Sequence, residues 1–104
     1  MVVEAANMPV SPQAEIEFDQ RGLIVIPDLL ANAGGITVSF FEWVQNRSGL
    51  KWSRDRVEEN LKDTLDTAWK NTLELSQECS CSLRIAAYQI AIDRVKEAMV
   101  LKGF

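Results

Sequence analysis

The order strand, helix, strand over the first 27 residues constrains the fold more than any other feature of this sequence. Residues 2–6 form a short β-prone run, and Ser11 can cap a helix over residues 12–21 that has proline at its first position. Leu23–Pro27 is a continuous apolar run of strand length, which is typical of a strand covered on both faces. A crossover of this kind predicts two parallel strands in one sheet, connected with right-handed chirality.

Helices are predicted for the rest of the chain. Residues 36–46 carry apolar side chains at four-residue spacing, after a Gly34-Gly35 pair that we place in the loop before the helix. Ser53 can cap a long helix that runs to about residue 77, and Ser82 can cap a last one. The apolar stripes of these two long helices are Val57, Leu61, Leu65, Ala68, Thr72 and Leu75, and then Ile85, Tyr88, Ile92, Val95 and Met99.

These elements predict an α/β, helix-rich fold that forms a single unit over residues 1–104. Residues 1–27 form a partial Rossmann-like strand-helix-strand remnant, and residues 28–48 form a Gly-Gly loop and a helix. Residues 53–102 form a hairpin in which two long antiparallel helices close the molecule.

Composition excludes several classes of function. With 11 Lys+Arg against 15 Asp+Glu, the chain has no basic surface that would bind nucleic acid. It has neither a signal-peptide pattern nor a membrane-spanning stretch, so we expect a cytoplasmic protein. The only cysteines, Cys79 and Cys81, cannot form an ordinary zinc site without histidine, and we predict two unpaired thiols and no metal.

The carboxyl ends of the two predicted strands are where ligands bind in a parallel sheet. Asn7-Met8-Pro9 follows the first strand. Pro27-Asp28 and then Asn32-Ala33-Gly34-Gly35 follow the second, so we expect the two polar loops to meet at one edge. A helix that starts at two glycines exposes free backbone N–H groups, which suit an anion. Glycine pairs also serve simple helix entry, so both interpretations stay open at this point.

The most recognisable parts of the sequence are three segments, Glu4–Pro9, Ala31–Asn46 and Leu83–Tyr88. They resemble the glutamate dehydrogenase family, which includes glutamate, leucine, phenylalanine and valine dehydrogenases, and the ordered match extends over nearly the whole chain. The resemblance implies the C-terminal part of the NAD(P)-binding domain, in a chain too short to be the whole enzyme. Thr37-Val38-Ser39 and Phe41-Glu42-Trp43 look like the glutamate branch, whereas Met8 stands where many relatives carry glycine.

The resemblance also implies roles for individual residues. Asn7 corresponds to a residue on the ribose side of the nicotinamide nucleotide, and Asn32 to one that positions the nicotinamide and the substrate. Gly34 and Gly35 belong to the same cofactor-binding element, while Ser39 and Ile36 correspond to residues of the substrate pocket. The lysine and aspartate that the reaction requires have no counterpart here, so we predict no catalytic residue in this chain.

The implied reaction is the reversible oxidative deamination of L-glutamate to 2-oxoglutarate and ammonia, with NAD or NADP as cofactor. The Gly-x-Gly-x-x-Gly turn that holds the pyrophosphate is absent, and we expect the isolated chain to be inactive. A homo-oligomeric enzyme is expected, and open strand edges predict that the isolated chain self-associates. The alternatives are a leucine, phenylalanine or valine dehydrogenase segment, a noncatalytic helical interaction module, and part of a split enzyme.

Overall fold

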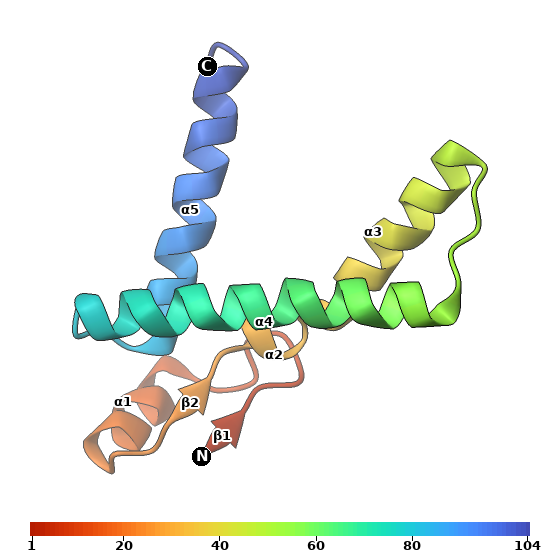
Figure 1. Ribbon diagram of the computed structural model, residues 1–104. Coiled ribbons are helices and arrows are strands. Elements are labelled where there is room, and N and C mark those ends of the chain that lie inside the picture. Colours follow the sequence, from red (N-terminus) through yellow and green to blue (C-terminus); the bar gives the residue numbers. More distant parts are fainter.

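The computed structural model describes residues 1–104 and begins with two short parallel strands joined by a helix (Figure 1). Strand β1 is Val2–Val3 and strand β2 is Val25–Ile26, with Val2 opposite Val25 in the register. Helix α1, Pro12–Gln20, forms the crossover between them. The predicted parallel strand-helix-strand unit is therefore confirmed, although each strand is shorter than its apolar run.

Local signals in the sequence set the bounds of the helices. The Ser11 side chain accepts a hydrogen bond from the Ala14 backbone N–H, and Gly22 ends α1 in the left-handed region with a φ of 66°. Ser53 caps helix α4, Arg54–Glu78, and Ser82 caps helix α5, Leu83–Leu101. These three predicted caps are confirmed.

The segment between β2 and α4 differs from the prediction of a glycine-containing loop. A short helix α2, Asp28–Ala31, follows β2 directly, and helix α3 runs over Ala33–Ser48. Gly34 and Gly35 therefore lie inside the first turn of α3 and do not precede it. Only Asn32 separates the two helices, so α3 begins three residues earlier than its apolar spacing indicated.

The last two helices do not lie along each other as the expected antiparallel hairpin (Figure 1). Helix α4 crosses the molecule, and α5 packs against it only near its own start before leading away. The buried residues of α5 are Leu83, Ala86 and Ala87, all in its first turns. The apolar side chains further along α5 are exposed, among them Ile92 at 62% and Val95 at 60%.

The core of the chain is small and partly polar. Its buried residues are Glu4, Pro27, Asp28, Phe41, Thr72, Leu83, Ala86 and Ala87. Most of them lie where the ends of the strands meet α2, α4 and the start of α5. Nothing among the helices is long and apolar enough to cross a membrane.

Candidate functional site

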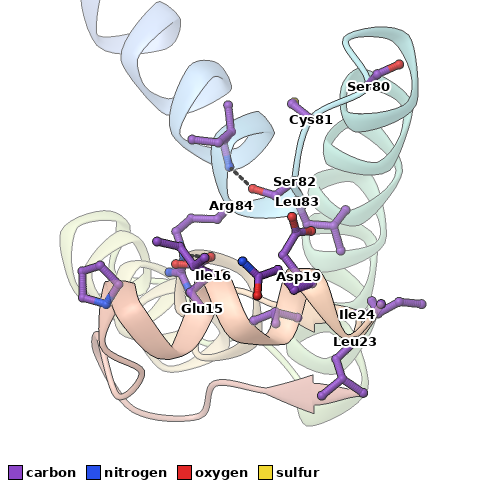
Figure 2. Close-up of a pocket in the computed structure, with 15 residues that line it drawn as sticks. Glu15, Ile16, Asp19, Leu23, Ile24, Ser80, Cys81, Ser82, Leu83 and Arg84 are labelled. Carbon is purple, nitrogen blue, oxygen red and sulfur yellow. Dashed lines mark hydrogen bonds and ion pairs between the residues drawn. The ribbon is translucent and has the colours of Figure 1, made fainter.

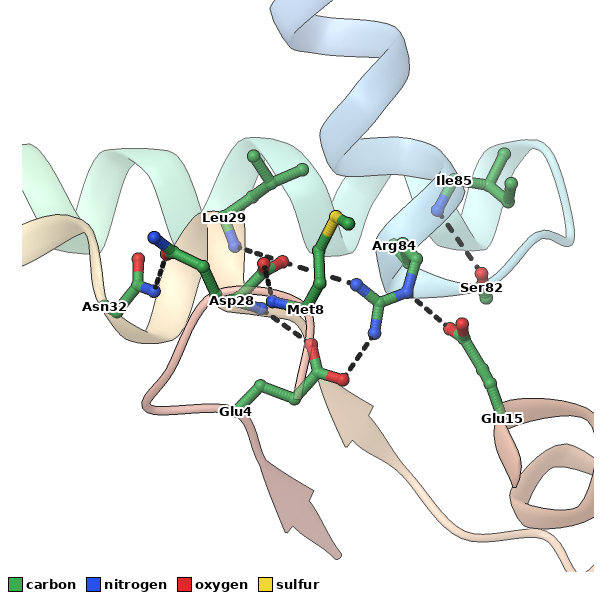
Figure 3. Close-up of polar contacts among 10 residues, drawn as sticks. Glu4, Met8, Glu15, Asp28, Leu29, Asn32, Ser82, Arg84 and Ile85 are labelled. Carbon is green, nitrogen blue, oxygen red and sulfur yellow. Dashed lines mark hydrogen bonds and ion pairs between the residues drawn. The ribbon is translucent and has the colours of Figure 1, made fainter. Parts of the chain in front are cut away.

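Asn7 and Asn32, hereafter the Asn pair, meet at the carboxyl edge of the sheet. The Asn32 Nδ2 group donates a hydrogen bond to Asn7 Oδ1 at 2.7 Å, although the residues are 25 positions apart (Figure 3). Asn7 lies in the loop after β1, and Asn32 lies between α2 and α3. The two polar loops therefore meet, as the parallel order of the strands predicted.

A shallow hollow of about 440 Å³ lies at the Asn pair, lined by Ala5, Ala6, Asn7, Asn32 and Ile36. The hydrogen bond within the pair uses Asn7 Oδ1 and one Nδ2 hydrogen of Asn32. The Asn7 amide nitrogen and the Asn32 carbonyl oxygen remain available to a ligand. Because Ile36 is 75% exposed beside them, the hollow offers amide donors and acceptors next to an apolar wall.

The other predicted site residues follow along α3. A Cβ atom at Gly34 would lie 3.9 Å from the side chains of Leu61 and Leu65, so Gly34 is on the side of α3 that packs against α4. Gly35 faces open space. Ser39 is exposed and lies one turn after Ile36, on the same side of the helix, although it does not line the hollow at the Asn pair.

Arg84, at the start of α5, forms a cluster with Glu4, Glu15 and Asp28 beside the Asn pair (Figure 3). Its guanidinium lies 2.7 Å from Glu4, 2.6 Å from Glu15 and 3.3 Å from Asp28. The Glu4 side chain is only 1% exposed, and that of Arg84 is 16% exposed. We refer to these four residues as the Arg84 cluster.

The carboxylates of the Arg84 cluster also bind backbone N–H groups. Glu4 Oε2 accepts from the Asp28 N–H at 3.0 Å, and Asp28 Oδ2 accepts from the Met8 N–H at 2.8 Å. The Met8 hydrogen bond is the main cause that lowers the pKa of Asp28, helped by the Leu29 N–H and Arg84 and opposed by burial. Burial alone would lower the pKa of Arg84, but its hydrogen bonds to Glu4 and Glu15 raise it instead.

Of the Arg84 cluster, sequence reasoning placed only Asp28 at this edge of the sheet and predicted none of the ion pairs. Glu4 is an acidic residue within a β-prone run, where a strand would bury it. A buried carboxylate requires a charged partner, so Glu4 alone could have indicated that an ion pair exists. The partner is 80 positions away along the chain, and spacing in the sequence does not identify it. Asp28 follows β2 directly, which is the usual position for a functional side chain in a parallel sheet.

A larger hollow of about 840 Å³ lies away from the Asn pair, between α1, β2 and the start of α5 (Figure 2). Arg84 and Glu15 line it, but they are already paired with each other. Cys81 is half-buried at its rim and Cys79 is exposed, and both are free thiols. No three His, Cys, Asp or Glu side chains are arranged to hold a metal ion.

Met8 adopts a left-handed backbone conformation, with a φ of 47°. Because its side chain is 73% exposed, Met8→Gly removes this strain and sacrifices little buried surface. We expect the free energy of unfolding, measured by urea denaturation, to rise by about 0.5–1 kcal/mol. Ala6→Gly is the matched control, since Ala6 has no positive φ and should lose stability. A loss in both variants would contradict the assignment of strain to Met8.

Comparison with known proteins gives matches over the whole chain. A model of the Glutamate/Leucine/Phenylalanine/Valine dehydrogenase family matches residues 1–103. The NAD-specific glutamate dehydrogenase of Staphylococcus aureus (strain COL) is 47% identical over 104 residues, which are 100% of this chain and 25% of that protein. The chain therefore spans about a quarter of the length of the curated relatives that it matches.

Solved structures give the same result. The crystal structure of glutamate dehydrogenase from Peptoniphilus asaccharolyticus matches with a TM-score of 0.90 and 39% identity, over 98% of this chain and 26% of that one. The hetero-hexameric glutamate dehydrogenase from Thermus thermophilus (Leu bound form) matches with a TM-score of 0.92 and 32% identity, over 97% and 24%. From the family match over residues 1–103 and these similarities in sequence and fold, the chain belongs to the glutamate/leucine/phenylalanine/valine dehydrogenase family.

Proposed function

We propose that this chain forms one wall of the nicotinamide and glutamate site of an NAD-dependent glutamate dehydrogenase. The proposed activity of the whole enzyme is the reversible oxidative deamination of L-glutamate to 2-oxoglutarate and ammonia. The observation that carries the proposal is the 2.7 Å hydrogen bond that joins Asn7 and Asn32, the two residues that the resemblance assigns to the nucleotide. The name of the S. aureus relative supports NAD as the cofactor.

The chemistry of the Asn pair fits the nicotinamide end of such a nucleotide. Ribose hydroxyls and the nicotinamide carboxamide both donate and accept hydrogen bonds, as do the amide groups that the pair leaves free. Asn7 would hold the ribose side, and Asn32 the nicotinamide side. When bound, the nucleotide supplies the hydride acceptor for oxidation of glutamate. The contribution of this chain is to bind and orient, because a small error in the position of the reacting groups reduces the rate strongly.

The substrate side of the proposed site is the exposed face of α3. Ile36 extends from the hollow at the Asn pair, and Ser39 lies one turn further along the helix. In the proposed site Ile36 contacts the side chain of the substrate, and the Ser39 hydroxyl donates to a carboxylate of glutamate. A hydroxyl at this position favours glutamate over leucine, because only glutamate has a side-chain carboxylate to accept the hydrogen bond. The proposed enzyme is an oligomer, as the hetero-hexameric T. thermophilus relative is.

A chimeric enzyme tests the proposal. The 104 residues replace the matching quarter of the S. aureus NAD-specific glutamate dehydrogenase, to which they are 47% identical. We expect the chimera to reduce NAD with glutamate as the preferred substrate over leucine. Within the chimera, Ser39→Ala should raise KM for glutamate about tenfold through loss of a hydrogen bond to a charged group, and should barely change the affinity for NADH.

Ser48→Ala is the control for Ser39→Ala, since it makes the same change at the other end of α3, where the hydroxyl bonds the Gln45 carbonyl. It should leave both KM values unchanged. An unchanged KM for glutamate in Ser39→Ala removes the substrate role of Ser39, and a preference for leucine overturns the choice of substrate. A folded chimera without glutamate-dependent activity contradicts the proposed function and favours a noncatalytic interaction module.

A further inference from the structure

Arg84 connects segments of the chain that are far apart in sequence. Its Nη2, Nε and Nη1 atoms donate to Glu4, Glu15 and Asp28, which are 80, 69 and 56 positions away. Glu4 follows β1, Glu15 lies on α1, and Asp28 begins α2, whereas Arg84 belongs to α5. One guanidinium thus joins the last helix to the segment after β1, to α1 and to α2.

Two of the three carboxylates bound by Arg84 also bind backbone N–H groups in the segments that carry the Asn pair. Asp28 accepts the Met8 N–H at 2.8 Å, and Met8 is the residue directly after Asn7. Glu4 accepts the Asp28 N–H at 3.0 Å and so fixes the start of α2, whose last turn leads to Asn32. Each member of the Asn pair is therefore one short segment away from a carboxylate that Arg84 holds.

The third carboxylate, Glu15, provides an internal comparison. It binds Arg84 at 2.6 Å, as closely as any member of the cluster. Unlike Glu4 and Asp28, it accepts no hydrogen bond from the backbone of the Asn7 loop or of α2. Loss of Glu15 removes an ion pair of the cluster and leaves the connection to the Asn pair in place.

We propose that Arg84 is a positioning residue, which holds Asn7 and Asn32 at nucleotide-binding geometry through Asp28 and Glu4. The inference rests on the proposed function of the Asn pair. It assigns to α5 a role in nucleotide affinity, although no residue of α5 lines the hollow at that pair. A lysine has one ammonium group on a flexible stem and cannot replace the planar fork that reaches three carboxylates in different directions.

Nuclear magnetic resonance of the 104-residue chain tests the positioning role without nucleotide. In the unchanged chain, the Met8 amide should be protected from hydrogen exchange, and the bonded Asn32 side-chain proton should resonate downfield of a free amide. We expect Arg84→Lys to remove both signatures, and Asp28→Asn to do the same without any change at Arg84. Glu15→Gln, the matched control, should keep both.

Binding of NADH to the chimera, followed by fluorescence, provides the second measurement. Arg84→Lys should weaken NADH binding by about tenfold, whereas Glu15→Gln should change it less than about twofold. The inference is overturned if Arg84→Lys and Glu15→Gln give the same amide signals and the same affinity for NADH. It is also overturned if Arg84→Lys and Asp28→Asn both unfold the chain. In either case Arg84 serves stability alone. If the chimera that carries the unsubstituted 104 residues binds no NADH, the proposed function is contradicted instead, whatever the amide signals show.

Discussion

Arg84→Met should lower the free energy of unfolding of this chain by about 3–5 kcal/mol, because it leaves buried carboxylates without their counterion. Glu4 is the main source of this cost, since its side chain is 1% exposed and loses a hydrogen bond of 2.7 Å. Asp28 keeps its two backbone donors and contributes less. Urea denaturation followed by circular dichroism measures the change as a shift of the midpoint at constant m-value.

Two further variants separate the loss of the counterion from the loss of a long side chain. Glu4→Gln removes the buried charge, so the double variant Arg84→Met/Glu4→Gln should recover part of the stability. Arg54→Met is the matched control, because Arg54 pairs with Glu58 at 2.6 Å while its side chain is 89% exposed. It should change stability by less than about 0.5 kcal/mol. Equal losses at positions 54 and 84 would refute the attribution to burial.

The pH dependence of stability follows from Asp28. The folded state lowers its pKa below the ordinary value of 3.8, mainly through the Met8 N–H, so the folded protein binds a proton less readily than the unfolded chain. The stability that Asp28 contributes is therefore complete above about pH 5 and is lost as the pH falls through the folded pKa. Arg84→Met should weaken this acid dependence, since Arg84 is one of the groups that lower the pKa.

The elements of this fold could be predicted from local sequence because each carries its own start signal. Ser11, Ser53 and Ser82 cap three helices at the predicted positions, since a cap depends only on residues within one turn. The parallel pairing of β1 and β2 followed from the crossover helix between them. Both kinds of inference need information from short stretches of the chain alone.

The direction of α5 could not be predicted in the same way. Its apolar stripe includes Ile92, Val95 and Met99, and regular spacing indicates a surface to be covered without indicating what covers it. In the structure these side chains are exposed, and α5 is held at its first turns by Leu83, Ala86 and Ala87. The small residues Ala86 and Ala87 allow α5 to approach α4 closely at a steep angle. A stripe of apolar positions does not specify that angle.

The candidate site was only partly visible in the sequence. The convergence of the Asn7 and Asn32 loops followed from strand order, whereas the ion pairs beside them did not, because Arg84 joins residues 56 to 80 positions away. The start of α3 was also misplaced. The glycine pair indicated a loop before the helix, yet both glycines lie in its first turn, where Gly34 faces Leu61 and Leu65 of α4.

Phe41→Ala should lower the free energy of unfolding by about 3–5 kcal/mol, since it removes a large buried side chain. Phe41 is 9% exposed, and its ring lies 5.6 Å from that of Trp52, between centroids. This contact ties α3 to the segment that leads into α4 and so holds the helix that carries Ile36 and Ser39. Urea denaturation followed by circular dichroism and tryptophan fluorescence measures the loss.

Phe40→Ala makes the same change at the adjacent position and is the matched control. Phe40 is 57% exposed and stacks on Trp43 at the surface of the same helix, with ring centroids 5.8 Å apart. Its loss should cost less than about 1 kcal/mol. A cost at position 40 equal to that at position 41 would contradict the attribution of the loss to burial of Phe41.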